Sequence, residues 1–205
     1  MTEDNHKEIE VKFFVQSLGA VEKRLQSNGA KRVQARTHEY NLRFDTSDQA
    51  MRKKLHLLRL RQDKRATLTF KGPSDSTQGV LSRVEIEVEV SDFETTRQLL
   101  EALGYQVAFI YEKYRATYEL KEVLVTLDET PLGDFVEIEG PNAEALQTTA
   151  QLLTLNWEVR ALENYSDLFA KAKAALGLDY RDLTFDNLTG IEITPEDMQI
   201  SAADR

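Results

Sequence analysis

The stretch EIEVKF, residues 8–13, carries two carboxylates and one ammonium group at alternate positions. In an extended strand, successive side chains point to opposite faces of the sheet. Glu8, Glu10 and Lys12 would therefore share one face, and the three apolar residues between and after them would share the other. This segment is predicted to form a strand with one ionic face and one apolar face.

The same alternation recurs along the chain, in LRLRQ (58–62), TLTFK (67–71), VEIEVEV (84–90), EKYRATY (112–118) and FVEIEG (135–140). Period-two alternation is the sequence signal of a half-buried strand. It predicts strands at residues 8–15, 39–45, 55–61, 66–71, 82–90, 112–119, 122–128 and 135–139. The connections 72–79 and 130–134 contain glycine and proline, as expected for turns between neighbouring antiparallel strands.

Segments in which apolar residues follow helical spacing lie between some of these strands. Apolar residues recur at three- and four-residue intervals after residue 18 and again after residue 93, and these stripes stop at Gly29 and Gly104. Two further helices are predicted at 142–154 and 160–176, the second ending at Gly177. The sequence therefore predicts an α+β fold, an eight-stranded antiparallel β-barrel that forms a tunnel, with amphipathic helices packed on the outside.

A single domain is predicted over residues 1–190, because no linker or repeat interrupts the pattern. Residues 191–205 have no long periodic pattern and are expected to form a loosely docked tail. A homodimer is kept as an expectation, although no feature of the sequence supports it.

Composition limits the partners. The 205 residues carry a formal charge of −9, which disfavours non-specific binding to nucleic acid, since that binding depends on Lys and Arg. No apolar run approaches the ~20 residues of a membrane span, and the first residues lack the apolar core of a secretory signal. With no cysteine in the chain, the expected location is the cytoplasm.

The charges of the predicted ionic face are sorted by strand. A single alternating strand is typical of a sheet with one face in water. Here, however, glutamates repeat on some strands and arginines or lysines on others, and like charges two residues apart repel one another. The predicted inward-facing groups are Glu8, Glu10, Glu85, Glu87, Glu89, Asp128, Glu137 and Glu139, together with Lys12, Arg59, Arg61, Lys71, Arg83, Lys113 and Arg115.

A cavity with both signs of charge fits one kind of chemistry well. Arg and Lys bind phosphate oxygens, and clustered carboxylates bind hard cations such as Mg²⁺ or Mn²⁺. Burying so many charges costs several kcal/mol per ion unless partners satisfy them, so stability alone does not explain the pattern. The residues predict a site for a polyphosphate and one or two divalent ions.

The motifs EIEVK, YNLRFDT, LRLR, LTFK, RVEIEVE, EKYR, LDE and VEIEG, in this order, resemble the CYTH domain of the triphosphate tunnel metalloenzymes. The resemblance runs from Glu8 to beyond Tyr165. This family includes class IV adenylyl cyclases, thiamine triphosphatases and inorganic triphosphatases. The resemblance implies an eight-stranded tunnel that binds a small-molecule triphosphate together with Mg²⁺ or Mn²⁺.

The resemblance also implies roles for residues. The bases expected to bind phosphate are Lys12, Arg59, Arg61, Lys71 and Arg115, with Arg83 and Lys113 as further members. The carboxylates expected to hold metal, directly or through water, are Glu8, Glu10, Glu85, Glu87, Asp128, Glu137 and Glu139. Salt bridges to the bases are the alternative for Glu89 and Asp128. Lys12 and Tyr40 are the candidate catalytic residues, positioning or deprotonating a water molecule.

Three functions follow from these expectations. The first is metal-dependent hydrolysis of inorganic triphosphate, a nucleoside triphosphate or thiamine triphosphate. The second is a class IV adenylyl cyclase, in which ATP gives cyclic AMP and pyrophosphate. The third is a non-catalytic module that binds polyphosphate or nucleotide. The sequence does not fix the register of the triphosphate in the tunnel, which is what separates the first two.

Overall fold

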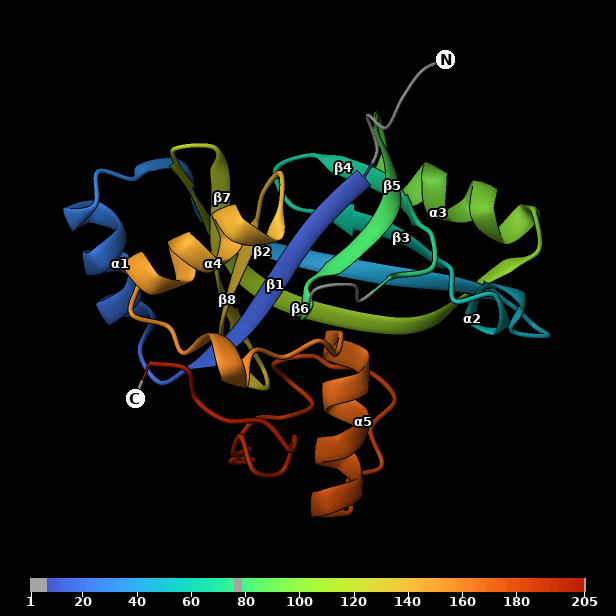
Figure 1. The fold of residues 1–205 in the computed structure, drawn as a ribbon. Coiled ribbons are helices and arrows are strands. Elements are labelled where there is room, and N and C mark those ends of the chain that lie inside the picture. The colour runs from blue at the N-terminus through green and yellow to red at the C-terminus, as the bar shows by residue number, and fades with distance from the viewer. Residues whose placement is uncertain (1–6, 76–78, 205) are drawn as a thin grey trace.

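The computed structural model describes residues 7–75 and 79–204, whose strands close into one barrel (Figure 1). The strands are β1 Lys7–Val15, β2 Lys31–Thr46, β3 Leu57–Gln62, β4 Ala66–Lys71, β5 Leu81–Val90, β6 Tyr105–Leu120, β7 Val123–Thr130 and β8 Gly133–Glu139. Their order around the barrel is β1-β5-β4-β3-β2-β6-β7-β8, and every neighbouring pair is antiparallel. The predicted fold class is confirmed.

Two strands are longer than predicted. β2 begins at Lys31 and β6 at Tyr105, whereas the predictions began at residues 39 and 112. The first half of β2 is mostly exposed, and its pairing with β6 is interrupted at Arg32/Gln34 and Gln34/Thr37, so its side chains show no clean alternation. The first half of β6 carries apolar residues on both faces. The alternation of polar and apolar residues does not identify these two segments as strands, because neither face of either segment is uniformly buried.

The hairpin between β7 and β8 depends on one glycine. Gly133 has a φ of 112°, and a Cβ atom there would lie 2.8 Å from the ring of Phe14. Only glycine combines this backbone angle with so close an approach. The loop between β4 and β5 is partly described, since residues 76–78 of the predicted connection lie outside the described residues.

Helices cover the outside of the barrel (Figure 1). They are α1 Leu18–Ser27, α2 Ala50–Lys53, α3 Phe93–Ala102, α4 Ala143–Leu152 and α5 Tyr165–Leu176, with a 3₁₀ turn at Trp157–Val159. The predicted start of the last helix at residue 160 is wrong. The amide of Ala161 donates to the carbonyl of Lys12, which extends the chain there, and the side chain of Asn164 then caps α5.

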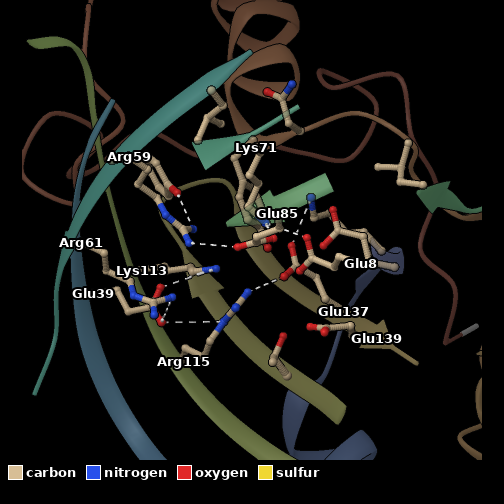
Figure 2. A pocket seen from close by; sticks show the side chains of 18 of the residues that line it. Glu8, Glu39, Arg59, Arg61, Lys71, Glu85, Lys113, Arg115, Glu137 and Glu139 are labelled. Carbon is tan, nitrogen blue, oxygen red and sulfur yellow. Dashed lines mark hydrogen bonds and ion pairs between the residues drawn. The ribbon is translucent and has the colours of Figure 1, made fainter. Parts of the chain in front are cut away.

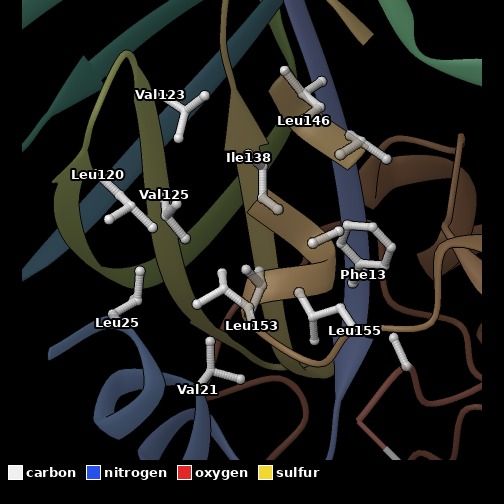
Figure 3. Close-up of a cluster of buried hydrophobic side chains, with 14 of the residues drawn as sticks. Phe13, Val21, Leu25, Leu120, Val123, Val125, Ile138, Leu146, Leu153 and Leu155 are labelled. Carbon is white, nitrogen blue, oxygen red and sulfur yellow. The ribbon is translucent and has the colours of Figure 1, made fainter. Parts of the chain in front are cut away.

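The main apolar core lies between the outer face of the barrel and helices α1 and α4 (Figure 3). Phe13, Val125 and Ile138 come from three strands and pack against Val21 and Leu146 of the two helices. All five are fully buried. Since these residues occupy the outer face, the alternate residues of the same strands must point into the barrel.

A second core joins α5 and the C-terminal residues to the barrel. Leu168 and Phe169 of α5 pack in one cluster with Leu183, Met198 and Ala202. The residues after 191 were expected to dock loosely, yet Met198 is fully buried, and the amide of Ala203 donates to the carbonyl of Phe14 at 2.9 Å. These contacts involve short irregular segments, which leave no periodic signal in a sequence. The division into a domain and a tail stays a prediction.

Among the described residues, no helix has the length and apolar character needed to cross a membrane.

Candidate active site inside the barrel

The interior of the barrel holds a cavity of about 730 Å³. Its wall consists largely of the inward-facing residues of the strands, and the first turn of α5 and a few residues of connecting segments contribute the rest. In Figure 2, basic side chains from β3 and β6 gather on one side, and most of the labelled glutamates gather on the other. The cavity therefore has a basic half and an acidic half.

Glu39 of β2 lies in the middle of the basic half (Figure 2). Its carboxylate is 3.7 Å from Lys113 Nζ and 4.0 Å from nitrogens of both Arg61 and Arg115. Burial alone would raise the pKa of Glu39, but the charges of Lys113, Arg115 and Arg61 outweigh it and hold the pKa below its ordinary value. One buried anion thus keeps three cations close together.

Asp128 of β7 is the second anchor of the basic half. It is fully buried, and it accepts hydrogen bonds from Lys113 at 2.9 Å, Arg115 at 2.6 Å and the hydroxyl of Tyr165 at 2.8 Å. These donors occupy both carboxylate oxygens. Asp128 therefore orients bases, and it does not line the cavity.

In the acidic half, carboxylates alternate with bases. Lys71 Nζ lies 2.9 Å from Glu8 and also pairs with Glu85. Arg83 bonds Glu10 at 2.7 Å. Burial, and then the neighbouring Glu85, raise the pKa of Glu8. Two carboxyl groups in contact favour sharing a proton or binding a cation.

Glu137 connects the two halves. It pairs with Arg115 and lies 3.2 Å from Lys12 Nζ. Burial opposes its ionisation, but the charges of Lys12 and Arg115 lower the pKa of Glu137 well below its ordinary value. Lys12 Nζ also lies 4.2 Å from the centre of the Tyr165 ring, so its position is defined on two sides.

Glu139 is the carboxyl group that most needs a cation. Burial, followed by the charges of Glu8 and Glu10, raises the pKa of Glu139 to about 7. In the part of the chain that the structure describes, no three carboxylate, imidazole or thiol groups are gathered into a metal-binding cluster. The donor set still fits Mg²⁺ or Mn²⁺, because it consists of carboxylate oxygens whose mutual repulsion a divalent cation would relieve.

The structure brings nearly all the predicted site residues together. Those that line the cavity are Glu8, Glu10, Lys12, Arg59, Arg61, Lys71, Arg83, Glu85, Glu87, Lys113, Arg115, Glu137 and Glu139. Their roles toward phosphate and metal stay predictions.

Three predicted residues lie elsewhere. Tyr40 packs against Phe93 of α3 on the outside of the barrel, because it alternates with Glu39, which points inward. This placement argues against the predicted role of Tyr40 in catalysis. Glu89 pairs with Arg65 at 2.9 Å beyond the cavity wall. Asp128 lies behind the wall, where it makes the salt bridges already named as its alternative.

Sequence reasoning missed several lining residues. Glu39 and Arg43 of β2 both face the cavity, as do Phe109 and Tyr111 of β6. The signal for the first pair was present in EYNLRFD (39–45), which alternates polar and apolar residues. No such signal marked the aromatic pair, because its strand is apolar on both faces.

A family model for the CYTH domain matches residues 6–165 of this chain. Over 134 residues the chain is 29% identical to a Methanocaldococcus jannaschii protein described as a candidate adenylate cyclase. That match covers 64% of this chain and 75% of the relative.

Two solved structures share the fold. One is a candidate adenylate cyclase from Vibrio parahaemolyticus, with a TM-score of 0.73 at 19% identity, covering 82% of this chain and 99% of that one. The other is a Hippeastrum protein described as a candidate adenylyl cyclase with a dominant triphosphatase activity. Its TM-score is 0.53 at 20% identity, covering 71% of this chain and 84% of that one.

Proposed function

Because the chain belongs to the CYTH domain family, we propose that it is a divalent-metal-dependent enzyme that hydrolyses a phosphoanhydride bond of a triphosphate. The observation that carries this proposal is the sorted charge of one cavity inside the barrel, with arginines and lysines on one side and mostly glutamates on the other (Figure 2). A triphosphate needs both halves, since its oxygens require cations and its metal requires carboxylates.

The basic half is the proposed seat of the phosphates. Arg59, Arg61, Lys113 and Arg115 present several N–H donors to one region, and Glu39 holds three of them close together. Because their carboxylate partners fix their directions before the substrate arrives, little side-chain entropy is lost on binding. Lys71 and Arg83 extend this set into the acidic half.

The acidic half is the proposed seat of the metal. Glu8, Glu10, Glu85 and Glu139 would hold Mg²⁺ or Mn²⁺, with Glu87 and Glu137 as further donors on the same wall. Such an ion neutralises phosphate charge and lowers the pKa of bound water. The raised pKa of Glu139 supports this assignment. Burial and neighbouring carboxylates disfavour the ionised form of Glu139, and a bound cation would stabilise that form in place of the proton.

The proposed chemistry is in-line displacement. The oxygen of a water molecule attacks the terminal phosphorus and the bridging P–O bond breaks. One proton of the water stays on the orthophosphate, the other passes to solvent, and orthophosphate and the shortened phosphate chain leave. Lys12 is the proposed catalytic residue. Its ammonium group lies between Glu137 and Tyr165, where it can bind the terminal phosphate and orient the attacking water.

A class IV adenylyl cyclase is the second candidate, favoured by the description of the Methanocaldococcus jannaschii relative. In that reaction the ribose 3′ oxygen attacks the α-phosphorus and pyrophosphate leaves. The same charged wall serves both reactions with the triphosphate in a different register. The cytoplasmic location and the homodimer stay predictions.

One assay separates the candidates. The protein is incubated with tripolyphosphate, ATP and thiamine triphosphate in Mg²⁺ or Mn²⁺, and the products are resolved. Orthophosphate supports the hydrolase, and cyclic AMP with pyrophosphate supports the cyclase instead. Binding without turnover would show a non-catalytic module and overturn the proposal.

A matched pair of variants tests the metal seat. Glu10→Gln removes one cavity carboxylate and should lower turnover at least about 100-fold, because a metal ligand is lost. Glu122→Gln removes a carboxylate from the exposed turn between β6 and β7 and should leave turnover unchanged. Wild-type rates in Glu10→Gln would refute the assigned role.

A further inference from the structure

One base of the cavity differs from all the others. Lys12, Arg59, Arg61, Lys71, Arg83, Lys113 and Arg115 each form an ion pair with a carboxylate. Arg43 lines the same cavity, yet within residues 7–75 and 79–204 it forms no ion pair. The charge of Asp167, which lines the same cavity, acts on Arg43 without forming an ion pair with it. A partly buried guanidinium without a direct ion pair favours a ligand that accepts hydrogen bonds.

The position of Arg43 is nevertheless well defined. Its Nη1 donates to the hydroxyl of Ser166 at 2.6 Å, and that hydroxyl in turn donates to Asn164 Oδ1 at 2.5 Å. Both residues belong to the start of α5, whose cap is Asn164. A guanidinium has five N–H donors, so this single contact leaves most of them available.

An aromatic side chain lies beside this guanidinium. Phe109 stands directly opposite Arg43 in the pairing of β2 with β6, and its ring centre is 5.9 Å from the guanidinium carbon. The ring is stacked on that of Tyr111, with centroids 5.9 Å apart and an interplanar angle of 21°. Leu57 and Leu162 line the same cavity. Apolar walls do not favour a phosphate, but they gain from covering a flat organic ring.

The cavity has room for such a group. Its volume of about 730 Å³ lies in the range that holds drug-sized organic ligands, roughly 300–1,000 Å³. The positive charge of Arg43, which no direct ion pair within the described residues neutralises, also repels a positively charged heterocycle such as the thiazolium of thiamine. A neutral ring with acceptor atoms on its edge suits the site better.

We propose that Arg43 and Phe109 form the subsite for the base of a nucleoside triphosphate. Arg43 donates to acceptor atoms on the edge of the base, and Phe109 contributes the apolar surface against which the base lies. This inference rests on the proposed function, since it assumes that the triphosphate occupies the charged part of the same cavity. It makes a nucleoside triphosphate the preferred substrate class.

The test compares substrates with and without a base. Michaelis constants for ATP, GTP and tripolyphosphate are measured with Mg²⁺ for the wild type, Arg43→Gln and Phe109→Leu. Loss of the Arg43 hydrogen bond should raise the ratio of the KM for ATP to that for tripolyphosphate about tenfold, and likewise for GTP. A merely structural defect would raise both constants together and leave the ratio unchanged.

Arg36→Gln is the matched control, since Arg36 lies on the same strand but pairs with Glu129 on the outer surface. It should leave the ratio at the wild-type value, and thermal melting of each variant checks the fold. Parallel loss of both substrates in Arg43→Gln, or an unchanged ratio, would overturn the inference.

Calorimetric binding of ATP and tripolyphosphate gives the same ratio without turnover. If tripolyphosphate binds but is not hydrolysed, the proposed function fails, while a tenfold change in the binding ratio would still support the subsite. If tripolyphosphate is hydrolysed and ATP neither binds nor reacts, the proposed function stands and the subsite is refuted.

Discussion

Glu39 is a buried carboxylate whose three cationic neighbours depend on it. Only 1% of its surface is exposed, and it lies within 4.0 Å of Lys113, Arg115 and Arg61. Glu39→Gln leaves these cations without that charge. We expect the free energy of unfolding, measured in urea, to fall by about 3 kcal/mol, since removing one member of a buried group of ion pairs leaves an excess of buried positive charge.

Tripolyphosphate should restore part of this stability, because it supplies the missing negative charge. The control is Glu129→Gln, which breaks an exposed pair with Arg36 and should cost less than about 1 kcal/mol. Equal effects of the two substitutions would contradict the central place of Glu39.

Glu139 should make the stability of the metal-free protein depend on pH. Burial and then Glu8 and Glu10 raise its pKa from 4.5 to about 7, so the folded protein holds this proton more tightly than the unfolded chain. Raising the pH removes the proton and disfavours the folded state. Glu139→Gln cannot ionise, so its Tm relative to wild type should be higher at about pH 8 than at about pH 5.

Differential scanning calorimetry at both pH values measures this difference. Excess Mg²⁺ should cancel the advantage of the variant at the higher pH, because the cation stabilises the ionised wild-type carboxylate. A Tm difference that stays constant across this range would show that Glu139 titrates normally.

At the scale of elements, α5 contributes both to the wall of the cavity and to the second apolar core. Its first turn lines the cavity, and its middle packs in the second core through Leu168 and Phe169. Leu168→Ala should lower the free energy of unfolding by about 3 kcal/mol, since Leu168 is fully buried and its removal leaves a cavity. Chemical denaturation gives the value.

Leu176→Ala is the control for this helix, because Leu176 at its end is 38% exposed and should matter by less than about 1 kcal/mol. If Leu168→Ala were equally mild, α5 would not be held by this core, and the Arg43 contact with Ser166 would lose its support.

At the scale of the whole molecule, the ligand site ties the barrel together. Most of the bases and carboxylates of the cavity come from β1, β2, β3, β4, β5, β6 and β8. A triphosphate bound with metal would therefore stabilise the folded state as a unit. At a ligand concentration 100 times Kd the expected gain is about 2.7 kcal/mol.

Thermal melting measures that gain. Tripolyphosphate with Mg²⁺ should raise Tm more than either alone, because each supplies the counter-charge that the other half of the cavity needs. Adding EDTA should remove most of the shift. An increase in Tm with tripolyphosphate that EDTA does not change would speak for phosphate binding without metal.

The sequence predicted most of the charged residues that line the cavity but missed some of the other lining residues. The glutamates of EIEVKF and the first two of VEIEVEV line the cavity as predicted, because alternation is a local property of an extended chain, whereas Glu89 lies beyond the cavity wall. Phe109 was missed because the first half of its strand is apolar on both faces, and Tyr40 was assigned to the site although its neighbour Glu39 takes the inward direction. The alternation of polar and apolar side chains distinguishes the two faces of a strand. Where both faces carry apolar residues, the sequence does not show which face lies inside the barrel.

The sequence by itself determined the strands, the ionic face of most of them and the closed antiparallel arrangement that such faces favour. Only the tertiary structure decided which acid meets which base: Asp128 is held by Lys113 and Arg115, Glu8 by Lys71, and Arg43 by no carboxylate of the described chain. The physical reason is that these contacts join side chains of different strands, such as Arg115 of β6 and Asp128 of β7. They depend on strand register and closure, which join residues far apart in sequence and leave no trace in the local spacing of side chains.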